Sequence, residues 1–267
     1  MEHLLKQIEL YTEQGDMEKV VSGWELVIDK FPETDFAGKG YREIGQAYEE
    51  NGDLINARSF YERAEERVPL ERRAPLREKI EDLNIRILFS PIATDQSVLY
   101  EVQPGDTLGK IARKFKTTVN LIKRSNHLKD DLIIPGRKLK VTISKFSIVV
   151  NATENILFLN RDGELFKTYT VSTGEDNSTP AGTFFIEEKM VKPVWYKMGA
   201  VVSPESAEYE LGSRWLGLSL EGYGIHGTSD ESTIGSHVTK GCVRLKNNEV
   251  EELFDIVPSG SEVIIIK

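Results

Sequence analysis

The chain has few residues that can form disulfides or bind zinc. Its 267 residues include one cysteine, Cys242, and four histidines. One thiol excludes an internal disulfide and any zinc site built from several thiolates. No apolar run approaches the roughly 18–20 residues that a membrane-spanning helix needs. The first ten residues, MEHLLKQIEL, have no apolar core for an export signal, so the protein either stays inside the cell or has lost a leader.

Charge is present in excess, but its sign alternates along the chain. Residues 1–97 carry 13 basic and 21 acidic side chains, residues 98–143 carry 10 and 4, and residues 144–267 carry 11 and 18. Three blocks of alternating sign predict three modules. The net charge of −9 argues against nucleic acid as the main partner.

The first block contains a repeat with an offset of 37 residues. Tyr11–Asp16 (YTEQGD) returns as Tyr48–Asp53 (YEENGD), and Lys30–Pro32 returns as Arg67–Pro69. The Gly-Asp pairs fit a left-handed helix end followed by an N-cap, which predicts tight turns between helices. Residues 2–68 resemble tetratricopeptide-type helical hairpins, and a further helix over about 70–87 would complete a domain at 1–89. Two interpretations stay open, namely a structural spacer and a groove for a protein partner.

The second block, residues 98–143, predicts a small βααβ domain. A strand from Leu99 runs into a Pro-Gly turn, and Asp106 or Thr107 can cap a helix whose inner face includes Leu108 and Phe115. A second helix near 119–126 and a closing strand follow. In apolar positions, turn residues and length, this block resembles a LysM domain.

The LysM resemblance implies binding to glycans that contain N-acetylglucosamine, in a groove between two loops. One loop would contribute Gly105, Asp106, Thr107 and Leu108, and the other Ile133, Ile134 and Pro135. The alternative is that these residues only shape the small domain.

The third block, residues 144–267, predicts a mainly-β sandwich with one small helix near 248–256. The expected strands are 146–151, 155–159, 164–172, 184–188, 216–220 and 263–266. The segment 192–209 is rich in aromatic and loop residues, so Trp195 belongs either to a flap over a groove or to a surface loop packed on the sheet.

Cys242 and His226 form the only candidate nucleophile and base pair. A free thiol is only a few per cent ionised at neutral pH, and a histidine is the side chain best suited to take its proton. Gly241 would allow the backbone to aim N–H groups at an oxyanion, and Arg244 could hold a substrate carboxylate. Taken alone, the residues leave open a buried structural thiol and a metal site with His237.

Several motifs together decide between these interpretations. His226-Gly-Thr, Ile234-Gly and Thr239-Lys-Gly-Cys-Val-Arg244 are similar to the signature of the YkuD-type L,D-transpeptidase catalytic domain. Val171–Gly174, Thr179–Phe184 and Leu211–Trp215 occur in the same order as in that family. The resemblance covers residues 146–267 and implies a β-sandwich with the cysteine in a loop-rich groove.

The resemblance implies that Cys242 attacks a stem peptide of peptidoglycan, releases D-alanine and holds the acyl group as a thioester until an amine takes it. His226 would be the general acid/base, supported by Gly241, Thr239, Gly227 and Arg244, and no cofactor or metal is implied. Lys240 stands where most members have histidine. Its charge is expected to favour the thiolate and to lower the Cys242 pKa.

LysM and transpeptidase motifs rest on different residues, yet both point to peptidoglycan. The resulting hypothesis is a cross-linking L,D-transpeptidase of the periplasm or cell wall, acting on stem peptides and localised by N-acetylglucosamine strands. An L,D-carboxypeptidase that uses water, and a non-catalytic wall-binding scaffold, are the alternatives.

Overall fold

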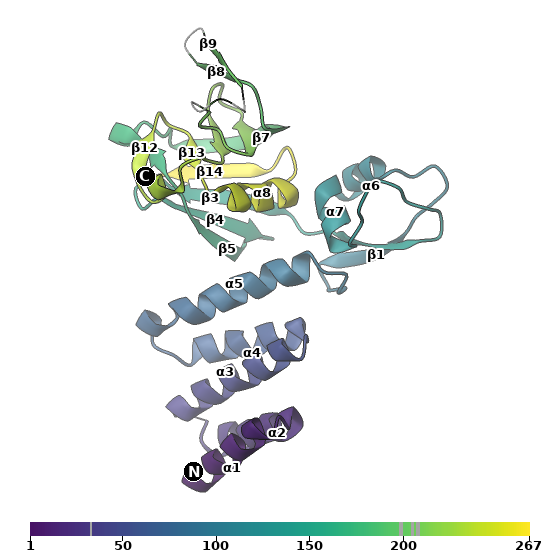
Figure 1. The fold of residues 1–267 in the computed structure, drawn as a ribbon, viewed down its shortest axis with the longest axis vertical. Coiled ribbons are helices and arrows are strands. Elements are labelled where there is room, and N and C mark those ends of the chain that lie inside the picture. The colour runs from purple at the N-terminus through teal and green to yellow at the C-terminus, as the bar shows by residue number, and fades with distance from the viewer. Residues whose placement is uncertain (33, 198–199, 204–205, 207–208) are drawn as a thin grey trace. The chain divides into compact units, whose positions relative to one another are not determined.

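The computed structural model divides the chain into two compact units, Met1–Leu88 and Phe89–Lys267 (Figure 1). It describes all residues except 33, 198–199, 204–205 and 207–208, and it does not describe the side chains at 195–197, 200 and 201. Within the described residues, no helix combines the length and the apolar character needed to cross a bilayer.

Helices that lie side by side in chain order build the first unit (Figure 1). They are α1 (Glu2–Glu13), α2 (Met17–Lys30), α3 (Asp35–Glu50), α4 (Leu54–Glu66), the short 3₁₀ turn η1 (Leu70–Arg72) and α5 (Ala74–Leu88). The expected helix at 70–87 therefore starts with a 3₁₀ turn before its α-helical part. Helical hairpins are confirmed here, whereas their assignment as tetratricopeptide repeats stays a prediction.

The repeated Gly-Asp pairs form the turns that the sequence predicts. Gly15 and Gly52 have φ of 69° and 79°, a left-handed conformation that favours glycine. Asp16 accepts a hydrogen bond from the N–H of Lys19, and Asp53 accepts one from the N–H of Asn56. Each pair thus ends one helix and caps the next, which explains the tight hairpins.

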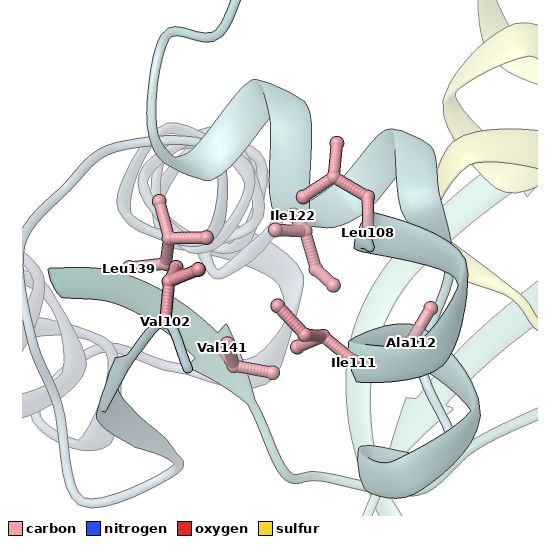
Figure 2. Close-up of a cluster of buried hydrophobic side chains, with 7 residues drawn as sticks. All are labelled: Val102, Leu108, Ile111, Ala112, Ile122, Leu139 and Val141. Atoms are coloured by element: carbon pink, nitrogen blue, oxygen red, sulfur yellow. The ribbon is translucent and has the colours of Figure 1, made fainter. Parts of the chain in front are cut away.

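The LysM-like region has the predicted βααβ order. It comprises β1 (Ser97–Glu101), α6 (Leu108–Phe115), α7 (Val119–Ser125) and β2 (Lys138–Thr142), with β1 and β2 antiparallel. Apolar side chains from both helices and from the strand region point toward one another in a small core (Figure 2). Thr107 and Thr118 cap the two helices through their hydroxyl groups.

The third region, residues 144–267, is mainly β with one α-helix among its described residues, as predicted. Eight strands form one sheet in the order β13-β11-β10-β7-β14-β3-β4-β5, and the long strand β7 (Gly182–Val191) pairs with both β10 and β14. The other seven are β3 (Phe146–Asn151), β4 (Ile156–Arg161), β5 (Glu164–Thr170), β10 (Arg214–Leu218), β11 (Gly224–His226), β13 (Val243–Arg244) and β14 (Glu262–Ile266).

Smaller elements complete this region. Helix α8 (Asn247–Ile256) packs on β10 and β11 and buries Val250 and Leu253. Two short pairs lie outside the main sheet: β6 (Thr173–Gly174) with β12 (His237–Thr239), and β8 (Trp195–Lys197) with β9 (Ala200–Val202). Alternating burial along β3 and β14 places every second side chain in the core, which is the period expected of strands.

Candidate active site

Cys242 and His226 line the same cavity, which has a volume of about 760 Å³. Lys240, Arg244 and Thr239 also line it, so five of the site residues predicted from sequence meet there. Its remaining walls include Trp215 and Tyr223, which were not predicted from the sequence.

Strand register explains why the cysteine and the histidine meet. Strands β11 and β13 are parallel neighbours, with Ile225 opposite Val243 and His226 opposite Arg244. Cys242 directly precedes β13, and side chains alternate along strands, so Cys242 and Arg244 share one face with His226. The two residues are sixteen positions apart in the sequence, and they meet because they lie on neighbouring strands.

Burial and one hydrogen bond fix the state of His226. Its side chain is 3% exposed, and its ring stacks on Trp215 with the centroids 5.8 Å apart. Nδ1 lies 2.7 Å from the carbonyl oxygen of Gly227, which can only accept, so Nδ1 carries the proton. Desolvation lowers the pKa of His226 to about 4. The hydrogen bond to the Gly227 carbonyl acts in the opposite direction and is the weaker effect. The imidazole is neutral at pH 7, and Nε2 keeps its lone pair.

Asn247, which was not predicted as a site residue, bonds Thr228 and Ser213, the residues next to Gly227 and Gly212. The Asn247 amide accepts from the N–H of Ser213 at 2.9 Å and donates to the carbonyl of Thr228 at 2.8 Å. A Cβ added at Gly227 would lie 2.3 Å from Asn247 Oδ1, and one at Gly212 would lie 2.4 Å from it. Two glycines therefore leave the space for one amide that ties the loop after His226 to the loop before β10.

The turn before the cysteine depends on Gly241. Its φ of 120° lies in the region that favours glycine, and an added Cβ would be 2.6 Å from the Tyr223 ring. Thr239 Oγ1 accepts from the Gly241 N–H at 3.2 Å and donates to the Cys242 carbonyl at 2.7 Å. The N–H of Gly241 is thus directed at Thr239, so Thr239 shapes the turn and Gly241 does not offer this donor to an oxyanion in the arrangement seen here.

The environment of Cys242 raises its thiol pKa. Burial has the largest effect, while the backbone of Gly224 and the charge of Arg244 act in the opposite direction. The thiol donates a long hydrogen bond to the carbonyl of Gly222, with S···O 3.8 Å. The expected lowering of the Cys242 pKa by Lys240 is therefore wrong for this state, because desolvation prevails and the cation that acts on the sulfur is Arg244.

Arg244 is largely buried beneath the groove. Its guanidinium forms an ion pair with Glu210, with N···O 3.4 Å, and its backbone exchanges two 2.8 Å hydrogen bonds with Ser172. The guanidinium is thus held in the groove wall, where its charge acts on Cys242 and His226.

His237 is directed away from a metal site with Cys242. One ring nitrogen lies 2.8 Å from Thr173 Oγ1 and the other 3.3 Å from Asn155 Nδ2. The described residues contain no group of three or more His, Cys, Asp and Glu side chains placed to hold a metal ion. His237 therefore joins β12 to the start of β4 through its hydrogen bonds.

The predicted flap is described only in part. Tyr209 is buried, packs with Val202 and donates a 2.8 Å hydrogen bond to the Pro193 carbonyl. Pro193 and Val194 line the active-site cavity. The side chain of Trp195 lies outside the described residues, so both interpretations of it stay predictions.

The predicted glycan loops of the LysM-like region lie next to each other. Val102, at the start of one, exchanges backbone hydrogen bonds with Gly136 and Arg137, at the end of the other. Ile134 is 61% exposed, and Pro135 is also exposed. Gly105 has a φ of 84° in its turn. Ile133 is half-buried and packs against the core.

Two residues of these loops have structural roles. Leu108 is 2% exposed and belongs to the core, as its place on the inner face of the helix predicts, and its role in the glycan groove stays a prediction (Figure 2). The Asp106 carboxylate accepts from the Tyr100 hydroxyl and from the Gln103 N–H, both at 2.8 Å. Those hydrogen bonds hold the Pro-Gly turn in place. Of the two apolar side chains Leu108 and Ile134, Ile134 is the one exposed to solvent.

Fold and cavity together define an enzyme with a helical unit, a LysM domain and a mainly-β domain whose cysteine and histidine meet in a groove. The LysM domain family matches residues 100–142, and the L,D-transpeptidase catalytic domain (YkuD) family matches residues 145–265.

Curated relatives agree with these matches. YkuD of Bacillus licheniformis is 35% identical over 177 residues, which cover 63% of this chain and 98% of that protein. YkuD of Bacillus subtilis is 34% identical over 174 residues, covering 62% and 97%. YocH of Bacillus subtilis, named a cell wall-binding protein, is 40% identical over 70 residues, covering 26% of this chain and 24% of that protein. The chain belongs to the YkuD family of L,D-transpeptidases.

Proposed function

We propose that the protein cross-links peptidoglycan through a thioester on Cys242, with release of D-alanine from a donor stem peptide. The observation that carries this proposal is the shared groove of Cys242 and a neutral His226 whose Nδ1 proton is fixed on Gly227. The family membership and the LysM domain support peptidoglycan as the substrate. The same context supports a site of action in the periplasm or cell wall.

Proton transfer follows from the two pKa shifts. The Cys242 pKa is raised and the His226 pKa is lowered to about 4, so the resting pair is a neutral thiol and a neutral imidazole. As Sγ attacks the carbonyl carbon of the donor peptide bond, Nε2 of His226 takes the thiol proton. The proton therefore moves as Sγ attacks the carbonyl carbon, because burial favours the neutral pair over a separate thiolate and imidazolium.

The remaining steps return the enzyme to its starting state. Collapse of the tetrahedral intermediate breaks the peptide bond, and His226 gives its proton to the departing amine of D-alanine. An amine of a second stem then attacks the thioester, loses a proton to His226 and forms a new peptide bond while the Cys242 thiol is restored. The partly apolar walls of the groove favour retention of the acyl group for this amine.

Arg244 and Lys240 supply positive charge to the groove. A stem peptide carries carboxylates, and cations in a partly buried cavity attract them more strongly than cations in water do. Arg244 is held by Glu210, so exposed Lys240 has the greater freedom to reach a substrate carboxylate.

Defined muropeptides provide the test. The protein is incubated with a tetrapeptide-bearing disaccharide, and mass spectrometry quantifies D-alanine, cross-linked dimer and tripeptide. The proposal expects dimer and D-alanine in equal amounts, and neither with Cys242→Ala. Tripeptide and D-alanine without dimer would replace transfer by hydrolysis, which is the carboxypeptidase alternative. Unchanged turnover by Cys242→Ala would refute the thioester route altogether.

A further inference from the structure

A second cavity, of about 1000 Å³, lies between the LysM domain and the catalytic domain. One wall is the end of α6 and the turn into α7, and the other is formed by residues 143–146, Lys189 and the turn at 258–261. Both walls belong to the same compact unit. This cavity shares no lining residue with the active-site groove.

Positive charge gathers along the lining of this cavity. Its lining includes Arg113, Lys116, Lys145 and Lys189, and no Asp or Glu. None of these four side chains forms an ion pair within the described part of the chain, although the chain as a whole has a net charge of −9. The Asp162 carboxylate lies beside the second wall, where it accepts from the Lys145 N–H at 2.8 Å. Four unpaired cations on one cavity attract a multiply charged anion.

Lys189 is half-buried, whereas the other three cations are exposed. Its ammonium donates to the carbonyls of Phe254 and Val257, the latter at 2.7 Å, and lies over the Phe254 ring. Burial lowers the pKa of Lys189 to about 8, and the charge of Asp255 acts in the opposite direction. An anion in the cavity would favour the charged form of this lysine.

The two walls are held together by Asp255 at the end of α8. Its carboxylate accepts from Asn120 Nδ2 at 2.6 Å and pairs with Arg124 at 3.0 Å, and its carbonyl accepts from the Thr118 hydroxyl. Thr118 also lines the cavity, so these contacts fix the walls beside it. A cavity with fixed walls loses little entropy when a ligand binds.

We infer that this junction cavity binds a ligand with two or more phosphate groups, held by Arg113, Lys116, Lys145 and Lys189. Each phosphate group adds at least one negative charge and offers several oxygens to more than one cation, whereas a carboxylate offers two oxygens in one plane. Apolar side chains of Phe115, Val119 and Ile143 also line the cavity, and they suit the short carbon chains of an organic phosphodiester. Inorganic polyphosphate and a phosphodiester polymer share the charged chemistry.

Calorimetric titration of the full chain tests this inference. The probes are sodium tripolyphosphate, a synthetic glycerol-phosphodiester oligomer and, as a carboxylate control, citrate. A double variant, Lys116→Gln with Lys145→Gln, removes two exposed cations of the cavity. The matched control, Lys129→Gln with Lys138→Gln, removes two exposed LysM lysines that do not line it.

The inference expects saturable binding of at least one phosphate probe and weaker binding of citrate. The cavity variant should bind about tenfold more weakly, a loss of about 1.4 kcal/mol, with the control variant within about twofold of wild type. Tighter binding of the oligomer would identify an organic phosphodiester as the source, and tighter binding of tripolyphosphate an inorganic one. Equal losses in both variants, citrate binding as tight as phosphate, or no saturable binding would overturn it.

Discussion

The active-site groove and the LysM loops present their functional residues in opposite ways. His226 is 3% exposed and Arg244 is 9% exposed, and both are set by the register of neighbouring strands. Ile134 is 61% exposed on a loop, and its neighbours are fixed by local hydrogen bonds. Chemistry on a peptide bond needs groups whose protonation is controlled by burial, whereas glycan recognition needs surface that a polymer can reach.

The largest effect should come from His226→Gln. Glutamine keeps much of the volume and can still donate to Gly227, but it cannot accept the thiol proton, so transfer should fall about 10²–10⁴-fold. The rate of muropeptide cross-linking measures this loss. His237→Gln is the control, because His237 bonds Thr173 and Asn155 outside the groove, and it should stay within a few fold of wild type. Equal losses in both variants would contradict the assignment.

The dependence of the protein's stability on pH should reveal that His226 is buried. Its folded pKa of about 4 lies below the unfolded value of 6.5, so the unfolded chain binds more protons between these values. The free energy of unfolding therefore keeps its full value above pH 6.5 and decreases by up to about 3 kcal/mol as the pH falls toward 4. Urea unfolding at several pH values measures this slope, and His226→Gln should flatten it. An unchanged slope in the variant would show that His226 is not the group that titrates.

Asn247→Ala should cost about 1–3 kcal/mol of stability, because it leaves the Ser213 N–H and the Thr228 carbonyl without a partner. The variant should also have a lower kcat, because a more mobile Gly227 loop would no longer hold the His226 ring in place through its carbonyl. Asn248→Ala, at the exposed neighbouring position, is the matched control. Thermal unfolding and the shift of the His226 ring resonances measure the two effects. A stability loss without any change at His226 would reduce Asn247 to a structural role.

The smallest effect should come from Ile134→Asp in the LysM loop. The change removes exposed apolar surface and adds a charge, so peptidoglycan pull-down should weaken about three- to tenfold, or about 1 kcal/mol. Cross-linking of a soluble muropeptide should not change. Leu99→Asp, at an exposed LysM position outside the loops, is the control. Weaker binding by both variants alike would place the glycan elsewhere on the domain.

Sequence patterns predicted the elements well where periodicity and turn chemistry agree. The Gly-Asp turns at 15–16 and 52–53, strand β3 and the βααβ order of the LysM domain follow from local preferences of these residues. Register and burial are not local, so they were not accessible. The lowered Cys242 pKa was therefore predicted without knowledge of its desolvation.

Asn247 illustrates the same limit within the active site. Five of the seven predicted active-site residues line the groove, because the motif around Cys242 is contiguous and His226 lies on the adjacent strand. Asn247 acts through Gly212 and Gly227, which lie far from it in the chain. The two glycines were the available signal in the sequence. Only the three-dimensional arrangement shows that a Cβ at either position would collide with the Asn247 amide.

Intact-protein mass spectrometry during turnover tests the central role of Cys242 most directly. With a donor tetrapeptide and no amine acceptor, wild-type protein should gain the mass of the donor minus D-alanine, and peptide mapping should place the adduct on Cys242. Addition of an acceptor stem should remove the adduct as dimer forms, and Cys242→Ala should never acquire it. An adduct on another residue, or the same adduct on Cys242→Ala, would contradict the proposed thioester mechanism.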